Sequence, residues 1–152
     1  MLSNKAKYAL KALLVLAEQY GHGPMLISDL AEREAIPKKF LEHILLELRK
    51  HGLLHSQKGR GGGYLLGKSP DEVTFGQVIR ILDGPLAPVP CVSQTAYQRC
   101  RECKDEATCG VRLVMKETRD AIAEVLDGVT LADGLKKVEG AAGRSRSRKA
   151  RK

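Results

Sequence analysis

The stretch PKKFLEHILLELRKHGLLHSQKGRGGGYLL, residues 37–66, combines two patterns that together decide the fold. Its first half repeats apolar residues at intervals of three and four, which predicts a helix with one buried face. Its second half is a short run, 53–57, then a glycine-rich cationic turn, 58–63, then another short run, 64–66. That order predicts strand, turn and strand, so the helix leads directly into a β-hairpin.

Helices are also predicted on both sides of this stretch. Residues 3–20 carry one apolar stripe at helical spacing and end at Gly21 and Gly23, and a short helix follows from Ser28. Three helices followed by a hairpin is the order of a winged helix, and one more short helix at 74–82 completes it. The predicted fold class is mainly α: a winged helix-turn-helix DNA-binding domain over residues 1–84, with a small β-hairpin wing.

The outer face of the third helix offers groups that suit DNA. Near its start, Lys38 and Lys39 can meet phosphates, while Glu42 can accept from a cytosine amino group and His43 can reach a base edge. A solvated helix face would carry similar charges, so this helix alone decides little.

The predicted wing strengthens the DNA-binding interpretation. Lys58 and Arg60 flank glycines, which allows a cationic tip to enter a narrow minor groove. Helix and wing together predict contact with double-stranded DNA.

All four cysteines, Cys91, Cys100, Cys103 and Cys109, fall in an irregular, proline-containing loop predicted over residues 85–109. Clustered thiols in a reducing compartment are metal ligands more often than disulfides, because soft thiolate sulfur suits zinc and iron–sulfur clusters. The spacing contains only one close pair, Cys100 with Cys103, which favours an iron–sulfur cluster over a zinc ribbon. Zinc bound by four thiolates and metal-free redox-active thiols stay open as alternatives.

A long amphipathic helix is predicted after the cysteines, within a dimerisation helix and terminal segment over residues 110–138. Its apolar stripe needs a partner, and a second copy is the simplest one, although packing on its own domain is the alternative. A two-fold homodimer would present two recognition helices to a palindromic operator. The predicted dimer-interface residues are Val111, Val114, Thr118, Ile122 and Val125.

Composition limits the remaining function classes. The net charge of +8 depends on a basic tail, residues 139–152, because removing its six cations leaves 20 basic and 18 acidic residues, a net charge of +2. This tail is predicted to be disordered. The apolar run near the start is interrupted by Lys11 and closed by Glu18, so neither a secretion signal nor a membrane span is expected, and the predicted location is cytoplasmic. The histidines have no catalytic partner at motif spacing, so we expect no enzyme and no small-molecule substrate.

Several of these segments resemble the family of bacterial winged-helix transcription regulators that includes IscR, NsrR, RirA and CymR. The similar segments are Tyr8-Ala9, Phe40-Leu41-Glu42, residues 48–53, residues 61–68 (GGGYLLGK) and residues 130–133. The resemblance covers about residues 1–138 and implies a homodimer joined through the long helix. It also implies a role in promoter choice for Glu42, and minor-groove contact for Lys58.

In this family, many members hold an iron–sulfur cluster through three cysteines, and the cluster controls DNA binding. Cys103 and Cys109 match the last two of those cysteines, and Cys91 matches the first. The family's fourth ligand is missing, because Arg112 stands where some members have His and Lys7 stands where others have Asp.

Cys100 is therefore our candidate for the fourth ligand of either a 2Fe-2S or a 4Fe-4S cluster. The resemblance implies a DNA-binding transcription regulator, expected to be a repressor, controlled by this cluster or by redox state. The alternatives are a cluster-free family member that answers a metabolite or a partner protein, and a zinc-stabilised interaction module.

Overall fold

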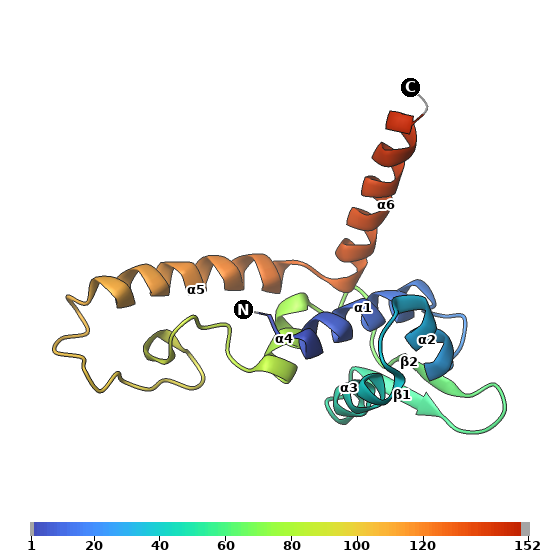
Figure 1. The fold of residues 1–152 in the computed structure, drawn as a ribbon, viewed down its shortest axis with the longest axis horizontal. Coiled ribbons are helices and arrows are strands. Elements are labelled where there is room, and N and C mark those ends of the chain that lie inside the picture. Colours follow the sequence, from blue (N-terminus) through green and yellow to red (C-terminus); the bar gives the residue numbers. More distant parts are fainter. Residues whose placement is uncertain (1, 150–152) are drawn as a thin grey trace.

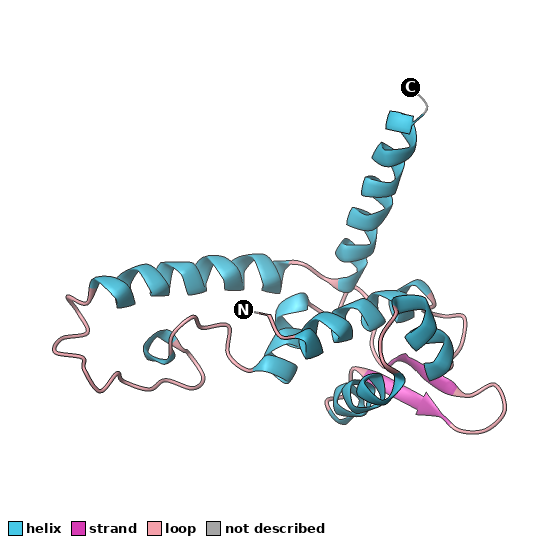
Figure 2. Ribbon diagram, viewed as in Figure 1, coloured by secondary structure: helices cyan, strands magenta, loops and turns pink. Residues whose placement is uncertain are grey.

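A computed structural model describes residues 2–149 of the chain, with side chains through residue 144, as a set of helices with one small two-stranded sheet at the edge of the helical part (Figure 1, Figure 2). This mainly α architecture, with a two-stranded antiparallel hairpin after the third helix, agrees with the prediction. In chain order the elements are α1 (Asn4–Glu18), α2 (Ile27–Glu34), α3 (Lys38–Lys50), β1 (Leu54–Gln57), β2 (Gly63–Leu66), α4 (Phe75–Asp83), the 3-10 turn η1 (Pro90–Val92), α5 (Gly110–Gly128) and α6 (Leu131–Lys149).

α1 is the central helix of the DNA-binding unit. Ser3 caps its start, because its hydroxyl oxygen accepts a hydrogen bond from the Ala6 amide at 3.0 Å. The helix is buried on more than one face, since α3, α4, β2 and α6 all pack against it. Small side chains on α1 allow these neighbours to approach closely. Its buried residues are Ala6, Ala9, Leu10, Ala12, Leu13, Val15, Leu16 and Ala17.

A tight turn orients α3 relative to α2. α2 ends at Ala35, which has a left-handed backbone with φ +52°, and Ile36 is buried directly after it. Pro37 then precedes α3, where its fixed φ suits the start of a helix. The predicted buried face of α3 is confirmed at Leu41, Ile44, Leu45 and Leu48, all of which are fully buried.

Phe40 falls on the same apolar stripe of the sequence, which predicts burial, but it is partly exposed at the edge of α3. Its ring packs edge-on against Tyr8 of α1, with ring centroids 5.8 Å apart. The apolar stripe of α3 is therefore narrower at its first turn than its periodicity suggests.

The hairpin pairs Leu54 with Leu66 and Gln57 with Gly63. Its root is fixed to the loop after α1 by an isolated bridge, in which Met25 and Tyr64 exchange backbone hydrogen bonds of 2.8 and 2.9 Å. Among residues 2–149, no backbone hydrogen bond of this kind joins the turn between the strands to the body of the domain. The wing therefore has a fixed base and an exposed tip.

The long helix α5 begins at the far end of the cysteine loop and returns along it toward α4 (Figure 1). None of its residues is fully buried, although one side contacts η1 and α4. The chain then crosses back to the domain, where Leu131 at the start of α6 is fully buried in the core. Two backbone bonds fix this return, from the Leu131 amide to the Val73 oxygen at 2.9 Å and from the Phe75 amide to the Val129 oxygen at 3.0 Å.

The basic tail differs from the prediction of disorder over residues 139–152. α6 continues as a helix to Lys149 and projects away from the domain in Figure 1, whereas residues 150–152 lie outside the described part of the chain. Alanine, arginine and lysine favour helix, and the packed first turns of α6 supply the nucleus that an isolated segment would lack. A segment with few apolar residues does not form a core of its own. It can still be helical when it continues a helix whose first turns pack in the core.

Candidate nucleic-acid interface and cysteine loop

The predicted DNA-contacting residues of α3 lie on its solvent face. Lys38, Lys39, Glu42 and His43 are all exposed, on the side away from the leucines that enter the core. They occupy the first two turns, where a recognition helix presents side chains to base edges and phosphates.

Two contacts from other elements hold α3 in place. Lys5 of α1 pairs with Glu47 at 2.5 Å, and Arg49 donates a hydrogen bond to the Ser56 hydroxyl of β1 at 2.8 Å. Arg49 therefore joins the helix to the wing, a role that sequence spacing did not reveal. Helix and hairpin form one unit rather than two separate contacts.

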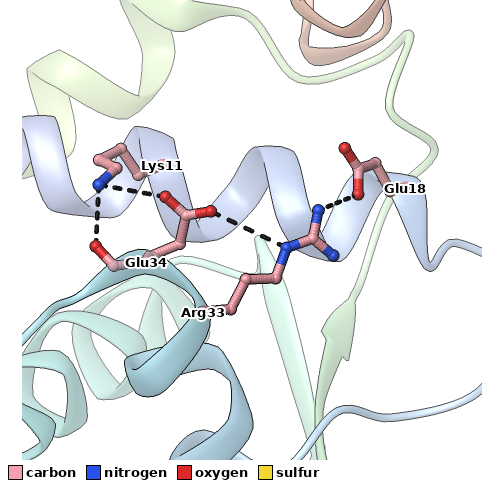
Figure 3. Close-up of polar contacts among 4 residues, drawn as sticks. All are labelled: Lys11, Glu18, Arg33 and Glu34. Carbon is pink, nitrogen blue, oxygen red and sulfur yellow. Dashed lines mark hydrogen bonds and ion pairs between the residues drawn. The ribbon is translucent and has the colours of Figure 1, made fainter.

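A chain of charged residues ties α1 to the end of α2 (Figure 3). The Lys11 ammonium donates to the Glu34 backbone oxygen at 2.9 Å and pairs with the Glu34 carboxylate at 3.1 Å. Arg33 reaches the other Glu34 oxygen at 4.0 Å and also binds Glu18. Because Glu34 immediately precedes the left-handed turn, these contacts fix the residue from which α3 departs.

At the wing, Lys58 and Arg60 are exposed in the turn between the strands. The turn is closed by a hydrogen bond from the Gly62 amide to the Gly59 oxygen at 3.0 Å. A Cβ on Gly62 would lie 2.3 Å from the Gln57 oxygen, so only glycine fits there. The geometry presents two cations at the exposed tip of the wing.

The four cysteines have different environments. Cys91 is buried in η1, Cys100 is exposed, and Cys103 and Cys109 are half-buried, with Cys109 at the cap of α5; all four are free thiols. A bond from the Gln98 amide to the Pro90 oxygen at 3.2 Å brings the middle of the loop back to η1.

This loop closure brings the Cys100 thiol to Cys91. The hydrogen bond with Cys91 and the electrostatic effect of that thiol raise the pKa of Cys100, with smaller contributions from burial, Cys103 and Glu102. A raised pKa favours the protonated form, so Cys100 is not an activated thiolate in this arrangement.

The positions of the family's fourth ligand are occupied by other interactions. Arg112 lies 3.8 Å from the Glu106 carboxylate, and Glu106 also accepts a hydrogen bond of 2.5 Å from Tyr97, which raises the pKa of Tyr97. Lys7 is exposed, with its ammonium 5.4 Å from the centre of the Tyr8 ring. Neither side chain is available or chemically suited as a metal ligand.

The cysteines suit a soft metal by type but not by arrangement. Within residues 2–149, no group of three or more His, Cys, Asp or Glu side chains is close enough together to hold a metal ion. A cluster would therefore need the loop to bring its thiols together, and the structure contains no ready-made site for one.

The predicted dimer face of α5 is exposed. Val111, Val114 and Val125 are 66%, 55% and 62% exposed, and Ile122 is 38% exposed. Thr118 lies between them and satisfies its hydroxyl on the Val114 oxygen at 2.9 Å. Nothing within the described part of the chain covers this stripe.

A helix-turn-helix, a cationic wing rooted beside its second helix, and a long exposed helix define a DNA-binding protein of the winged-helix class. Residues 2–137 match the Rrf2 family, described as "Iron-dependent Transcriptional regulator", and the chain belongs to this family. The predicted family and the predicted mainly α, winged-helix fold are thus confirmed.

Individual relatives agree with the family assignment. The chain is 46% identical over 138 residues to a regulator described as rrf2-like from Rhodobacter capsulatus, covering 89% of this chain and 92% of that one. It is 36% identical over 132 residues to the HTH-type transcriptional regulator CymR of Bacillus subtilis, covering 87% of each.

Solved structures show the same fold. The structure of B. subtilis CymR, described as the global cysteine regulator, superposes with a TM-score of 0.76 at 34% identity, covering 90% of this chain and 97% of that one. T. potens IscR superposes with a TM-score of 0.74 at 32% identity, covering 93% and 90%. The protein is a transcription regulator and not an enzyme. None of its described helices combines the length and apolar character needed to cross a membrane.

Proposed function

We propose that the protein is a homodimeric repressor that binds a palindromic operator through α3 and the wing, and whose affinity depends on the state of its four cysteines. The observation that carries the DNA-binding part is the common placement of cationic and hydrogen-bonding groups on the exposed start of α3 and at the wing tip. The contact residues proposed are Lys38, Lys39, Glu42, His43, Lys58 and Arg60.

The homodimer is supported by the uncovered apolar stripe of α5. Valines exposed by more than half on a 19-residue helix are costly in water, and burial in a two-fold contact would remove that cost. A dimer built this way would carry two copies of α3, which suits a palindromic site. Because bacterial DNA lies in the cytoplasm, the proposal places the protein there.

The sensing element proposed is the loop of residues 85–109. Cys91, Cys100, Cys103 and Cys109 supply four soft donors for an iron–sulfur cluster, and the family description as iron-dependent supports iron as the metal. Within residues 2–149 no three possible ligands lie close enough together to hold a metal, which supports the second form of the proposal, in which the thiols sense redox state without metal.

The likeness to CymR favours one alternative. CymR shares the fold closely and is described as a cysteine regulator, so a cluster-free protein that answers a metabolite or a partner protein fits the same architecture. A zinc-stabilised interaction module is the less favoured alternative, because it leaves the cationic wing without a role.

Two measurements test the proposal. Anaerobic purification followed by iron, acid-labile sulfide and zinc determination identifies the metal: iron and sulfide in equal amounts support the cluster, and zinc alone supports the structural module. Protein without metal, even after incubation with ferrous iron and sulfide, leaves thiol chemistry or a metabolite.

DNA binding is measured with a duplex selected by the protein from a random-sequence pool. Lys58→Ala should weaken binding and reduce the slope of log affinity against log salt by about 1, because one phosphate contact is lost. Lys116→Ala, on the exposed side of α5, is the matched control and should change neither. An unchanged slope for Lys58→Ala would remove the wing from the interface.

A further inference from the structure

Arg119 of α5 contacts the cysteine loop directly. Its guanidinium donates a hydrogen bond of 2.5 Å to the backbone oxygen of Val92, and Val92 immediately follows the buried Cys91 in η1. Only 13% of the Arg119 side chain is exposed, the lowest value among the described residues that form ion pairs. The long helix is thus joined to the segment that carries the first cysteine.

Burial makes this contact sensitive to movement of η1. A guanidinium is always charged, and its donors must be satisfied once they leave water. The Asp120 carboxylate accepts from Nε at 2.8 Å and also from Nη2, and the Val92 carbonyl in the loop accepts from Nη1. If Cys91 and Val92 shift, Arg119 loses that acceptor, and either the side chain or α5 must move to find another.

A second contact, called here the Arg80–Asp127 joint, connects α5 to the DNA-binding unit. Arg80 of α4 binds Asp127 of α5 through two hydrogen bonds of 2.5 and 2.8 Å, the two-pronged geometry that guanidinium and carboxylate favour. Gly76 allows this approach, since a Cβ there would lie 2.0 Å from the Asp127 carboxylate. A shift of α5 is therefore transmitted to α4, which packs on α1 and α3.

The Arg119–Val92 contact and the Arg80–Asp127 contact lie at the same place in the fold. Arg80 and Arg119 line the same small hollow, together with residues 85–87 and 94–95 of the cysteine loop and Ala123 of α5. Sensor loop, long helix and DNA-binding unit contact one another there, so a change in any one of them changes the fit of the other two.

We propose that Arg119 is the positioning residue through which the state of the cysteine loop reaches α5, and that the Arg80–Asp127 joint passes it on to the DNA-binding unit. The inference rests on the proposed function, namely that the four cysteines control DNA affinity. It adds the physical connection, which is a hydrogen bond between one buried guanidinium and the carbonyl beside Cys91.

The test compares DNA affinity across three preparations of each variant: incubated anaerobically with ferrous iron and sulfide, reduced without metal, and blocked with N-ethylmaleimide. The probe is the duplex that the wild-type protein selects from a random-sequence pool. For the wild type we expect the largest and smallest dissociation constants to differ about 5-fold or more, the lower range of allosteric coupling. For Arg119→Met the ratio should fall below about 2-fold, and for the control Lys116→Met it should stay at the wild-type value.

The outcomes separate the inference from the proposed function. If the wild type shows no difference among preparations, the cysteines do not control DNA binding and the proposed function fails. If the wild type responds and Arg119→Met responds equally, the proposed function stands and the connection through Arg119 is wrong. The ratio is informative because a purely structural role would weaken binding in all three preparations alike.

Amide hydrogen exchange on the wild-type protein gives a second test that needs no variant. Cysteine modification should change exchange in residues 90–93 and also in residues 110–128. A change confined to the loop would overturn the inference, even if Arg119→Met proved too unstable to assay.

Discussion

The anchor at the root of the wing predicts a large difference between two glycine substitutions in one turn. Gly63 has φ +143°, and a Cβ there would lie 2.1 Å from the Met25 oxygen, 2.5 Å from the Met25 carbonyl carbon and 2.9 Å from the Leu26 nitrogen. These are backbone atoms, so no side-chain rotation relieves the overlap. Gly61 also has a positive φ, +76°, but nothing lies within 4 Å of its Cβ position.

The magnitude follows from what each substitution disturbs. Gly61→Ala adds only the strain of a positive φ, about 1–2 kcal/mol. Gly63→Ala adds similar strain and also separates β2 from residue 25, which removes two backbone hydrogen bonds of about 0.5–1.5 kcal/mol each. The expected loss for Gly63→Ala is therefore about 2–5 kcal/mol, a large part of the stability of a domain of this size.

Urea unfolding followed by circular dichroism measures the difference. Both variants should keep the wild-type slope, and the midpoint of Gly63→Ala should lie well below that of Gly61→Ala. DNA affinity should fall with Gly63→Ala because the wing loses its fixed base. Equal midpoints for the two variants would refute the reasoning, since they would show that the strand–loop bridge contributes nothing.

Three further outcomes are expected. Ala35→Gly should raise the free energy of unfolding by about 0.5–1 kcal/mol, because relief of left-handed strain exceeds the extra chain entropy of glycine; urea unfolding measures it. Asp127→Asn should cost less than about 1 kcal/mol at pH 7, since the Arg80 and Asp127 side chains are 36% and 45% exposed and solvent screens the pair. Hydrogen bonding from Arg80 lowers the pKa of Asp127, so this contribution is complete above the ordinary aspartate pKa of about 3.9 and disappears as pH falls through the lowered value, as thermal melts at several pH values will show. The pair Val114→Asp with Val125→Asp should convert the proposed dimer to monomer in analytical ultracentrifugation while the helical circular dichroism spectrum is retained.

Each of these outcomes has its own control. Ala142→Gly, within α6, removes a methyl group without relieving any positive φ and should only destabilise. For Asp127→Asn, a stability difference that stayed constant as pH falls through the lowered pKa of Asp127 would show that charge is not the cause. Lys116→Asp reverses a charge on α5 outside the valine stripe, and dissociation by that variant would contradict the assigned interface.

The sequence predicts an element well when the pattern of apolar residues or glycines that defines the element lies within a few neighbouring positions. Leu41, Ile44 and Leu48 recur at helical spacing because one face of α3 enters the core, and the glycines after Lys58 mark a turn. Each of these signals is contained within a few neighbouring residues. The winged helix is therefore predictable from the amino-acid order alone.

The contacts that sequence does not predict join residues far apart in the chain. Arg119 reaches Val92 across 27 positions and Arg80 reaches Asp127 across 47, and no local pattern marks either pair. Likewise, four cysteines within 19 residues predict a shared site, but spacing alone could not show that Cys91 is buried while Cys100 is exposed. Loop conformation depends on tertiary packing, which has no period to detect.

The burial of Leu131 sets the order in which the chain can fold during synthesis. The core around α1 is closed by this residue, and the strand-like pairing of Thr74 with Thr130 holds it there. After residue 84, the predicted end of the DNA-binding domain, a ribosome adds 47 residues to reach residue 131, which takes roughly 2–9 s at about 5–20 residues per second. During that interval α1 and α4 have all their local neighbours but lack the leucine that seals them. The core of the nascent DNA-binding unit is therefore incomplete until the first residues of α6 have been synthesised.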